Sequence, residues 1–180
     1  MKGASIALVL LMALVVLQIA HYYPLVPDPM ASHFVLDGSP NGWSSRGAFF
    51  AIYLGSLVLT AGVLFLLAGL LKRMPDRSVS LPNRDHWLSS DRRDETLGYL
   101  QGAIAWCAIG VLLFLVLGTQ LVIRANLTAG GHLESGKLGW IAALLVLWIV
   151  QTPLRVYVRM SKVPGPGKTT MSSDRGGERA

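Results

Sequence analysis

Residues 47–71 read GAFFAIYLGSLVLTAGVLFLLAGLL, a run of 25 residues without a charged side chain. An α-helix rises about 1.5 Å per residue, so about 20 residues suffice to cross the hydrocarbon core of a bilayer. The hydroxyl groups in the run belong to Tyr53, Ser56 and Thr60, and such groups can bond to carbonyls of their own helix. The stretch therefore predicts a membrane-spanning helix.

Three further apolar stretches, at residues 4–22, 97–123 and 138–158, place the chain in the same class. The 180 residues are 52% hydrophobic and 14% charged, whereas about a quarter of the residues in a soluble domain are charged. We therefore expect an all-α integral membrane protein, with four transmembrane helices in residues 1–160. Residues 161–180 are rich in Pro, Gly, Lys and Ser, which predicts a disordered cytoplasmic tail.

The first stretch has a secretory signal peptide as its alternative, because a short basic start precedes the apolar run. Residues 17–20 lack a small residue two positions before a cleavage point, and three apolar stretches follow. We therefore expect the first stretch to remain in the protein as its first transmembrane helix and not to be cleaved off.

The basic residues predict the orientation of the helices, because Lys and Arg favour the cytoplasmic side of a membrane. With the N-terminus inside, thirteen Lys and Arg residues are cytoplasmic and three are outside, namely Arg46, Arg124 and Lys137. We expect both termini and the loop at residues 72–96 in the cytoplasm, and the loop at residues 23–46 outside.

The outer loop holds a polar segment between two apolar ones, SHFVLDGSPNGWSSR at residues 32–46. Residues 33–36 form a short extended run, and residues 37–38 and 40–42 supply two turn signals, because Gly and Asn tolerate positive φ and Pro fixes a turn's first corner. We expect a turn-rich lid on the helix ends, with Trp43 at the lipid interface and Arg46 paired with a lipid phosphate or with Asp37. The candidate binding or structural residues are His33, Phe34, Gly38, Pro40, Asn41, Gly42, Trp43 and Arg46.

The cytoplasmic loop is strongly charged and is interrupted by Pro75 and Pro82. Residues 90–95, SDRRDE, resemble the capped start of the next helix, with acidic side chains where the helix dipole favours them. We expect Trp87 to lie at the lipid surface. The candidate residues of this second motif are Pro82, Asn83, Asp85, Trp87, Arg92, Arg93 and Glu95.

Few polar side chains enter the later spans. Gln101, Gln120 and Gln151 lie near or within them, and no acidic or basic residue lies deep inside a span. Because proton-coupled transporters need ionisable groups at depth, this pattern argues against one. Gly98 and Gly102, four residues apart, would let another helix approach closely.

The sequence carries no signature of catalysis or of a cofactor. It contains neither Gly-x-Ser-x-Gly nor His-Glu-x-x-His, and its single cysteine, Cys107, can form no internal disulfide. His21, Asp28, His33 and Asp37 fit no tight spacing for metal ligands. The basic residues flank apolar blocks and do not gather on one folded face, which argues against nucleic acid as a partner.

The outer loop resembles the signature of a bacterial membrane domain catalogued as domain of unknown function 1648. The residues that carry the resemblance are Pro27-Asp28, His33-Phe34, Gly38, Pro40-Asn41-Gly42-Trp43 and Arg46. In that family the loop reads approximately Leu-Pro-x-x-Ile-Pro-x-His-Phe-Asn, then Gly-x-Pro-Asp-x-Trp and a basic residue. Here Ala31 replaces the second Pro and Val35 replaces the Asn.

The same domain forms the N-terminal part of SdpI-type toxin-immunity and signalling membrane proteins. Residues 81–96 also resemble that family's second conserved stretch, so the resemblance covers the first three helices. It implies a multi-pass protein of the bacterial inner membrane.

Two hypotheses about function follow. In the first, a non-enzymatic sensor, immunity or accessory protein binds an envelope peptide or a membrane protein through residues 32–46. Residues 82–96 then relay the signal or act as a docking segment. In the second, a small transporter or membrane enzyme binds a substrate or metal in a polar cavity, with His33 and His86 at its two ends. The lack of ionisable residues at depth favours the first hypothesis.

Overall fold

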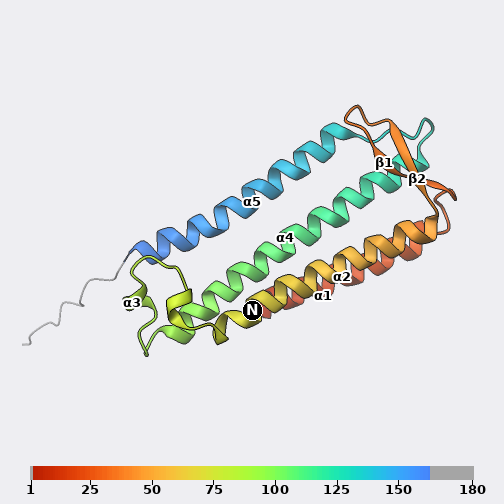
Figure 1. The fold of residues 1–180 in the computed structure, drawn as a ribbon. Coiled ribbons are helices and arrows are strands. Elements are labelled where there is room, and N and C mark those ends of the chain that lie inside the picture. Colours follow the sequence, from red (N-terminus) through yellow and green to blue (C-terminus); the bar gives the residue numbers. More distant parts are fainter. Residues whose placement is uncertain (1, 163–180) are drawn as a thin grey trace, which may run out of the picture.

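The computed structural model describes residues 2–162, which form four long helices and one small antiparallel sheet (Figure 1). The long helices are α1 (Lys2–Tyr22), α2 (Arg46–Leu70), α4 (Arg93–Leu127) and α5 (Ser135–Ser161), and the strands are β1 (Met30–Phe34) and β2 (Pro40–Ser44). All four helices are long and apolar enough to cross a membrane. The expected architecture, an all-α integral membrane protein with four transmembrane helices, is confirmed.

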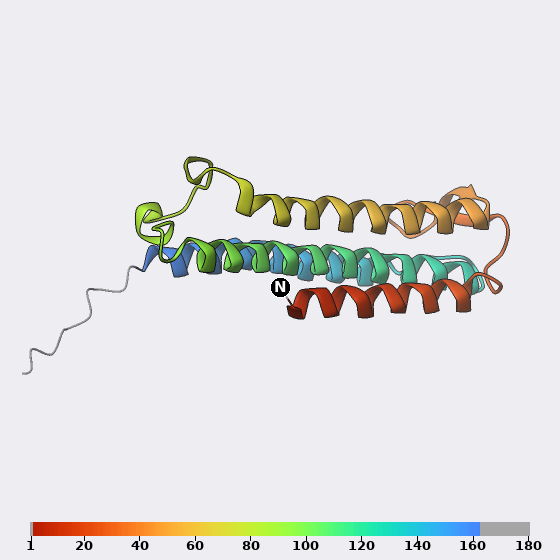
Figure 2. The same cartoon turned by 90° about the horizontal axis from the view of Figure 1, so that it is seen from below.

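Helix α4 is the centre of the molecule, because α1, α2 and α5 each pack against it (Figures 1 and 2). Its 35 residues reach about 52 Å, well beyond the hydrocarbon thickness of about 30 Å. Helix α1 is shorter and begins beside the middle of α4, where a Cβ on Gly3 would lie 3.7 Å from the Trp106 ring. The main core joins α1, α2, α4 and the segment before the sheet through Leu11, Val15, Val26, Met30, Phe50, Tyr53, Leu57, Leu112, Val116 and Ile123.

Hydrogen bonds between polar side chains also join the three helices inside this core. The Tyr53 hydroxyl donates to Gln18 Oε1 over 2.7 Å, and Gln18 Nε2 donates to Gln120 Oε1 over 2.8 Å. Further along the bundle, Gln101 Nε2 donates to the Ala68 carbonyl over 2.8 Å. Each buried amide therefore has a partner on another helix, as burial in an apolar medium requires.

Helix α5 lies on the outside of the bundle, and Met160 is its one buried residue. It contacts α4 through Trp148, whose indole N–H donates to the Trp106 carbonyl over 3.0 Å. The Trp148 ring lies over Gly110, where a Cβ would stand 2.5 Å from Cδ1. A side chain at residue 110 would therefore push α5 away from α4.

Helix α4 extends beyond the predicted span of residues 97–123 at both ends. Residues 124–127, which follow that apolar stretch, continue the helix, and Asn126 Nδ2 donates to the Val122 carbonyl over 2.9 Å. The expected helix start within residues 90–95 is confirmed, with Asp94 and Glu95 in the first turn of α4, but the expected cap is absent, because the residue before the helix is Arg92 and its side chain makes no capping bond. Helix α5 continues to Ser161, and residues 163–180 of the predicted tail lie outside the described residues.

The connection between α2 and α4 forms a second, smaller core at the end opposite the sheet. It contains the short helical turns η1 (Leu71–Arg73) and η2 (Asp76–Ser78) and the helix α3 (Arg84–Trp87). Its buried residues are Val79, Leu88, Leu97 and Leu100. We call this end of the molecule the loop end, and the opposite end, with the sheet, the hairpin end.

Candidate functional site

The candidate residues of the first motif lie in a β-hairpin, residues 30–44, that crosses the ends of the helices (Figure 1). Met30 pairs with Ser44 and Phe34 pairs with Pro40, and the register shifts near His33. This differs from the expected extended run at residues 33–36 and second turn at residues 40–42. The hairpin has one turn, residues 35–39.

Hydrogen bonds within the turn explain why the chain reverses once. Val35 N–H donates to the Ser39 carbonyl and Gly38 N–H donates to the Val35 carbonyl, both over 2.9 Å. The Asp37 carboxylate accepts the backbone N–H of Ser39 over 2.7 Å, which holds the pKa of this exposed carboxyl below its usual value. Pro40 follows as the first residue of β2, a position where a strand tolerates proline.

Gly38 fastens the turn to the connection between α4 and α5. Its φ of 92° is in the region that favours glycine, and its carbonyl accepts the Leu133 N–H over 2.8 Å. A Cβ at this position would overlap the Leu133 carbonyl oxygen. Both the backbone conformation and the packing therefore require glycine at residue 38.

Asn126 fastens the base of the hairpin to the end of α4. Its Oδ1 accepts the Ala31 N–H over 2.7 Å, and its Nδ2 donates to the Ala31 carbonyl over 2.9 Å. The side-chain amide thus pairs with Ala31 as a neighbouring strand would. Asn126 is not among the candidate residues predicted from the sequence, because 95 positions separate it from Ala31.

We expect the substitution Asn126→Ala to loosen the base of the hairpin, since it removes two hydrogen bonds worth about 1 kcal/mol each. Amide hydrogen exchange at residues 30–34 should become faster by about tenfold or more. Thr128→Ala is the matched control, because the Thr128 hydroxyl donates only to the Arg124 carbonyl of its own helix. Equal exchange in the two variants would contradict the role of Asn126.

Arg46 begins α2 and packs beneath the hairpin, away from Asp37. Its Nη1 lies 3.5 Å from the Val26 carbonyl, and its guanidinium lies 4.7 Å from the centre of the Tyr23 ring. Its backbone N–H donates to the Asp28 carboxylate over 3.1 Å. The structure therefore does not form the expected pair between Arg46 and Asp37, and a lipid phosphate as its partner stays a prediction.

Several hairpin side chains remain exposed. Leu36 is 98% exposed, Trp43 61% and Val35 41%. His33 and Asn41 are also exposed, and the His33 ring covers Gly42, where a Cβ would stand 3.1 Å from the His33 Cβ. We call Val35, Leu36 and Trp43 the exposed apolar residues of the hairpin.

A groove of about 830 Å³ lies between the hairpin turn and the first turns of α5. Its lining is mostly apolar and includes Phe34, Val35, Leu36, Leu133 and Leu138, with Asp37 at the turn. The groove therefore offers an apolar surface next to one carboxylate.

The second motif holds the loop end against the C-terminus of α5. The Trp87 indole N–H donates to the Met160 carbonyl over 2.7 Å, and Asn83 Nδ2 donates to the carbonyls of Met160 and Ser161 over 3.1 and 3.2 Å. These bonds satisfy carbonyls that the last turn of a helix leaves without partners. Trp87 is therefore half-buried against the end of α5, and its place at the lipid surface stays a prediction.

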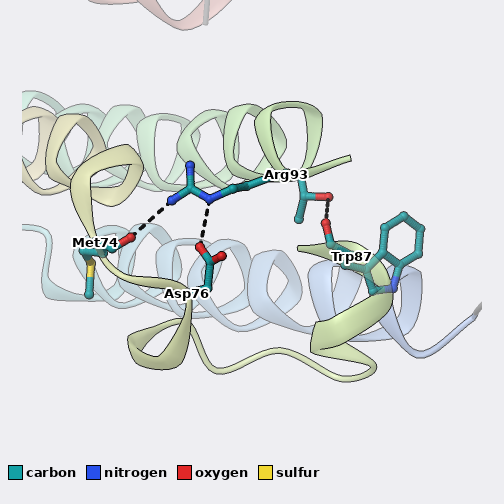
Figure 3. A network of polar contacts seen from close by, with 5 residues as sticks. Met74, Asp76, Trp87 and Arg93 are labelled. Carbon is teal, nitrogen blue, oxygen red and sulfur yellow. Dashed lines mark hydrogen bonds and ion pairs between the residues drawn. The ribbon is translucent and has the colours of Figure 1, made fainter. Parts of the chain in front are cut away.

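Other residues of the motif attach the connection to α4 (Figure 3). Arg93 Nε donates to Asp76 Oδ1 over 2.8 Å and Nη2 donates to the Met74 carbonyl over 3.3 Å. Thr96 Oγ1 donates to the Trp87 carbonyl over 2.8 Å.

The remaining candidates make weaker or more exposed contacts. Asp85 pairs with Arg84 over 3.4 Å, Glu95 lies 3.8 Å from Arg159, Arg92 lies against His86, and Pro82 lines an apolar groove. The two motifs are thus at opposite ends of the molecule, joined by α4 and α5.

Residues 2–162 contain no group of three His, Cys, Asp or Glu side chains that could hold a metal ion. His33 is in β1 and His86 is in α3, so the two histidines lie at the two ends of the helices (Figure 1).

Comparison with known proteins identifies one domain. Residues 8–59 match the family described as "Domain of unknown function (DUF1648)", a match that includes the hairpin and its motif and ends before residues 81–96. Searches of curated proteins and of solved structures found no match. The segment from residue 8 to residue 59, with the hairpin at its centre, is therefore the part of the chain that is similar to the DUF1648 family.

Proposed function

We propose that the protein is a non-enzymatic component of the bacterial inner membrane whose hairpin recognises an envelope peptide or another membrane protein. The excess of basic residues at the loop end supports an orientation with that end in the cytoplasm. In this orientation the hairpin is on the outer side. An immunity, sensing or accessory role, as in SdpI-type proteins, is the proposed context.

The observation that carries the proposal is that the hairpin is fixed at two points while its apolar side chains stay exposed. Asn126 fixes the base and Gly38 fixes the turn. Leu36 and Trp43 contribute little to the core, being 98% and 61% exposed. Exposed apolar and aromatic side chains on a rigid element are typical of a surface that binds a partner.

The chemistry of the groove suggests the kind of partner. Apolar side chains line it, and the exposed Asp37 carboxylate, whose pKa the Ser39 N–H lowers further below its ordinary acidic value, is charged at neutral pH. A segment with apolar side chains and one basic residue would complement this surface. Partner binding there would contact the start of α5, whose other end is held by Trp87 and Asn83.

Photo-crosslinking in cells tests the proposal. A photoreactive amino acid replaces Trp43, and mass spectrometry identifies what it traps. We expect an adduct with a specific peptide or protein that is reduced about tenfold or more by Leu36→Asp and by His33→Ala, since truncation of central contacts typically costs 1 to 2 kcal/mol or more. The same probe at Tyr157, which is 61% exposed on α5, is the control and should trap lipid.

Lipid adducts alone from Trp43, in a protein that is well expressed, would refute the recognition of a partner by the hairpin. A metal- or substrate-dependent activity lost with both His33→Ala and His86→Ala would support a transporter or an enzyme instead.

A further inference from the structure

Two adjoining cavities lie between α4 and α5. The first, about 510 Å³, is near the loop end and is lined by the polar side chains Tyr99, Gln151, Thr152 and Arg155. The second, about 320 Å³, is nearer the middle of the helices, and its lining is apolar and includes Leu113, Phe114, Leu117 and Leu144. Trp106 and Trp148 line both cavities. The two cavities therefore adjoin at these two residues, and we call them together the groove, with a polar part and an apolar part.

Glycines on α4 leave space in the polar part. No atom lies within 4 Å of the position that a Cβ would take on Gly98 or on Gly102. The expected close approach of another helix at these residues is therefore absent in the structure. The two glycines instead line an opening between the helices.

Two donors in the polar part have no partner in the described part of the chain. Within residues 2–162, neither the Arg155 guanidinium nor the Gln151 amide forms a hydrogen bond or an ion pair. One turn further along α5, Arg159 lies 4.2 Å from the centre of the Tyr99 ring, and its ion pair with Glu95 is long, 3.8 Å. Arg155, Arg159 and Lys162 recur at helical spacing, so this face of α5 is cationic.

The position of Arg155 fits the depth of a lipid headgroup. Seventeen uncharged residues separate it from Lys137 on α5, a rise of about 27 Å between the two cations, close to the hydrocarbon thickness of a bilayer. A cation at this depth, with the apolar part of the groove extending toward the membrane centre, matches an amphiphile in both charge and polarity.

We propose that this groove binds an anionic phospholipid from the leaflet at the loop end. The phosphate binds Arg155, with Gln151 as a second donor, and one acyl chain passes Trp106 and Trp148 into the apolar part. A soluble anion would leave the apolar part unused, and an uncharged lipid would leave Arg155 without a counterion. The groove is open to the bilayer, which supplies such a lipid directly.

Native mass spectrometry of the purified full chain tests the proposal, with phosphatidylglycerol and phosphatidylcholine of identical acyl chains as probes. We expect the protein to bind one phosphatidylglycerol about tenfold more tightly than phosphatidylcholine, and Arg155→Gln to weaken phosphatidylglycerol binding about fivefold. Arg77→Gln is the matched control, because it removes one exposed cation at the same end outside the groove, and it should leave binding unchanged.

Gly102→Leu gives a second, independent variant. It fills the polar part without meeting another atom at Cβ, and it should weaken phosphatidylglycerol binding, whereas Gly62→Leu, on open surface of α2, should not. Equal binding of the two lipids, unchanged binding in Arg155→Gln, or displacement of the lipid by inorganic phosphate would each overturn the proposal. The last result would identify a site for a soluble anion.

Discussion

Replacing Gly38 by alanine is expected to detach the hairpin from the helix ends. An alanine at a φ of 92° carries backbone strain, and its Cβ would overlap the Leu133 carbonyl that lies against the turn. Strain of this kind together with the lost bond from Leu133 N–H should lower the free energy of hairpin opening by about 2 to 3 kcal/mol. Amide exchange at residues 30–44 should then accelerate by about 30-fold or more.

The variant Gly130→Ala is the control that separates the effect of backbone strain from the effect of steric overlap at Cβ. Gly130 has a φ of 95°, but no atom lies within 4 Å of its Cβ position. The variant carries similar backbone strain without a collision, so exchange should accelerate near residues 128–131 and not in the hairpin. Similar hairpin exchange in both variants would show that the contact with Leu133 does not hold the turn.

The substitution Gln18→Leu is expected to destabilise the bundle itself. It leaves the Tyr53 hydroxyl and Gln120 Oε1 without their partner in an apolar interior. Single hydrogen bonds between membrane helices contribute about 0.6 kcal/mol on average, and stranded polar groups add a desolvation cost. We expect a loss of about 2 kcal/mol in the free energy of unfolding, measured by denaturation in mixed detergent and lipid micelles.

A double-mutant cycle checks whether the side chains act as one network. Combining Gln18→Leu with Tyr53→Phe should cost less than the sum of the two single variants, because both remove the same bond. Ser56→Ala is the control, since the Ser56 hydroxyl donates to the Tyr53 carbonyl within α2. Strict additivity of the two variants would mean that Gln18 and Tyr53 do not interact.

The four helices could be predicted because the length of an apolar run is a local property of the sequence. The hairpin could be predicted only in part. The turn signal at Gly38 does mark a turn, whereas residues 40–42, which are also typical of turns, form part of strand β2. The strand is fixed by pairing with β1 and by the His33 ring over Gly42. Neither contact can be read from the local sequence.

The contacts that the sequence analysis missed join residues far apart in the chain. Gln18 and Gln120 are 102 positions apart, and each alone looks like an interruption of an apolar run. The position of Trp87 near a span predicts a place at the lipid surface, because an isolated tryptophan there often lies at that level. The sequence gives no sign that its indole N–H also donates to the Met160 carbonyl, which lies at the end of a helix 73 positions later. Whether the two motifs bind anything stays a prediction.

Lys2 on α1 lies deeper in the bundle than the cations at the loop end, because its neighbour Gly3 packs beside Trp106. Trp106 is paired with Trp148, which lies seven residues before Arg155 on α5. Lys2, next to Gly3, therefore begins about 10 Å deeper than the level of Arg155. In a flat bilayer this lysine would lie in hydrocarbon, so we expect its side chain to extend toward the headgroups and the surrounding leaflet to thin on the α1 side. Bilayers with a thinner hydrocarbon core should therefore accommodate the protein with less deformation.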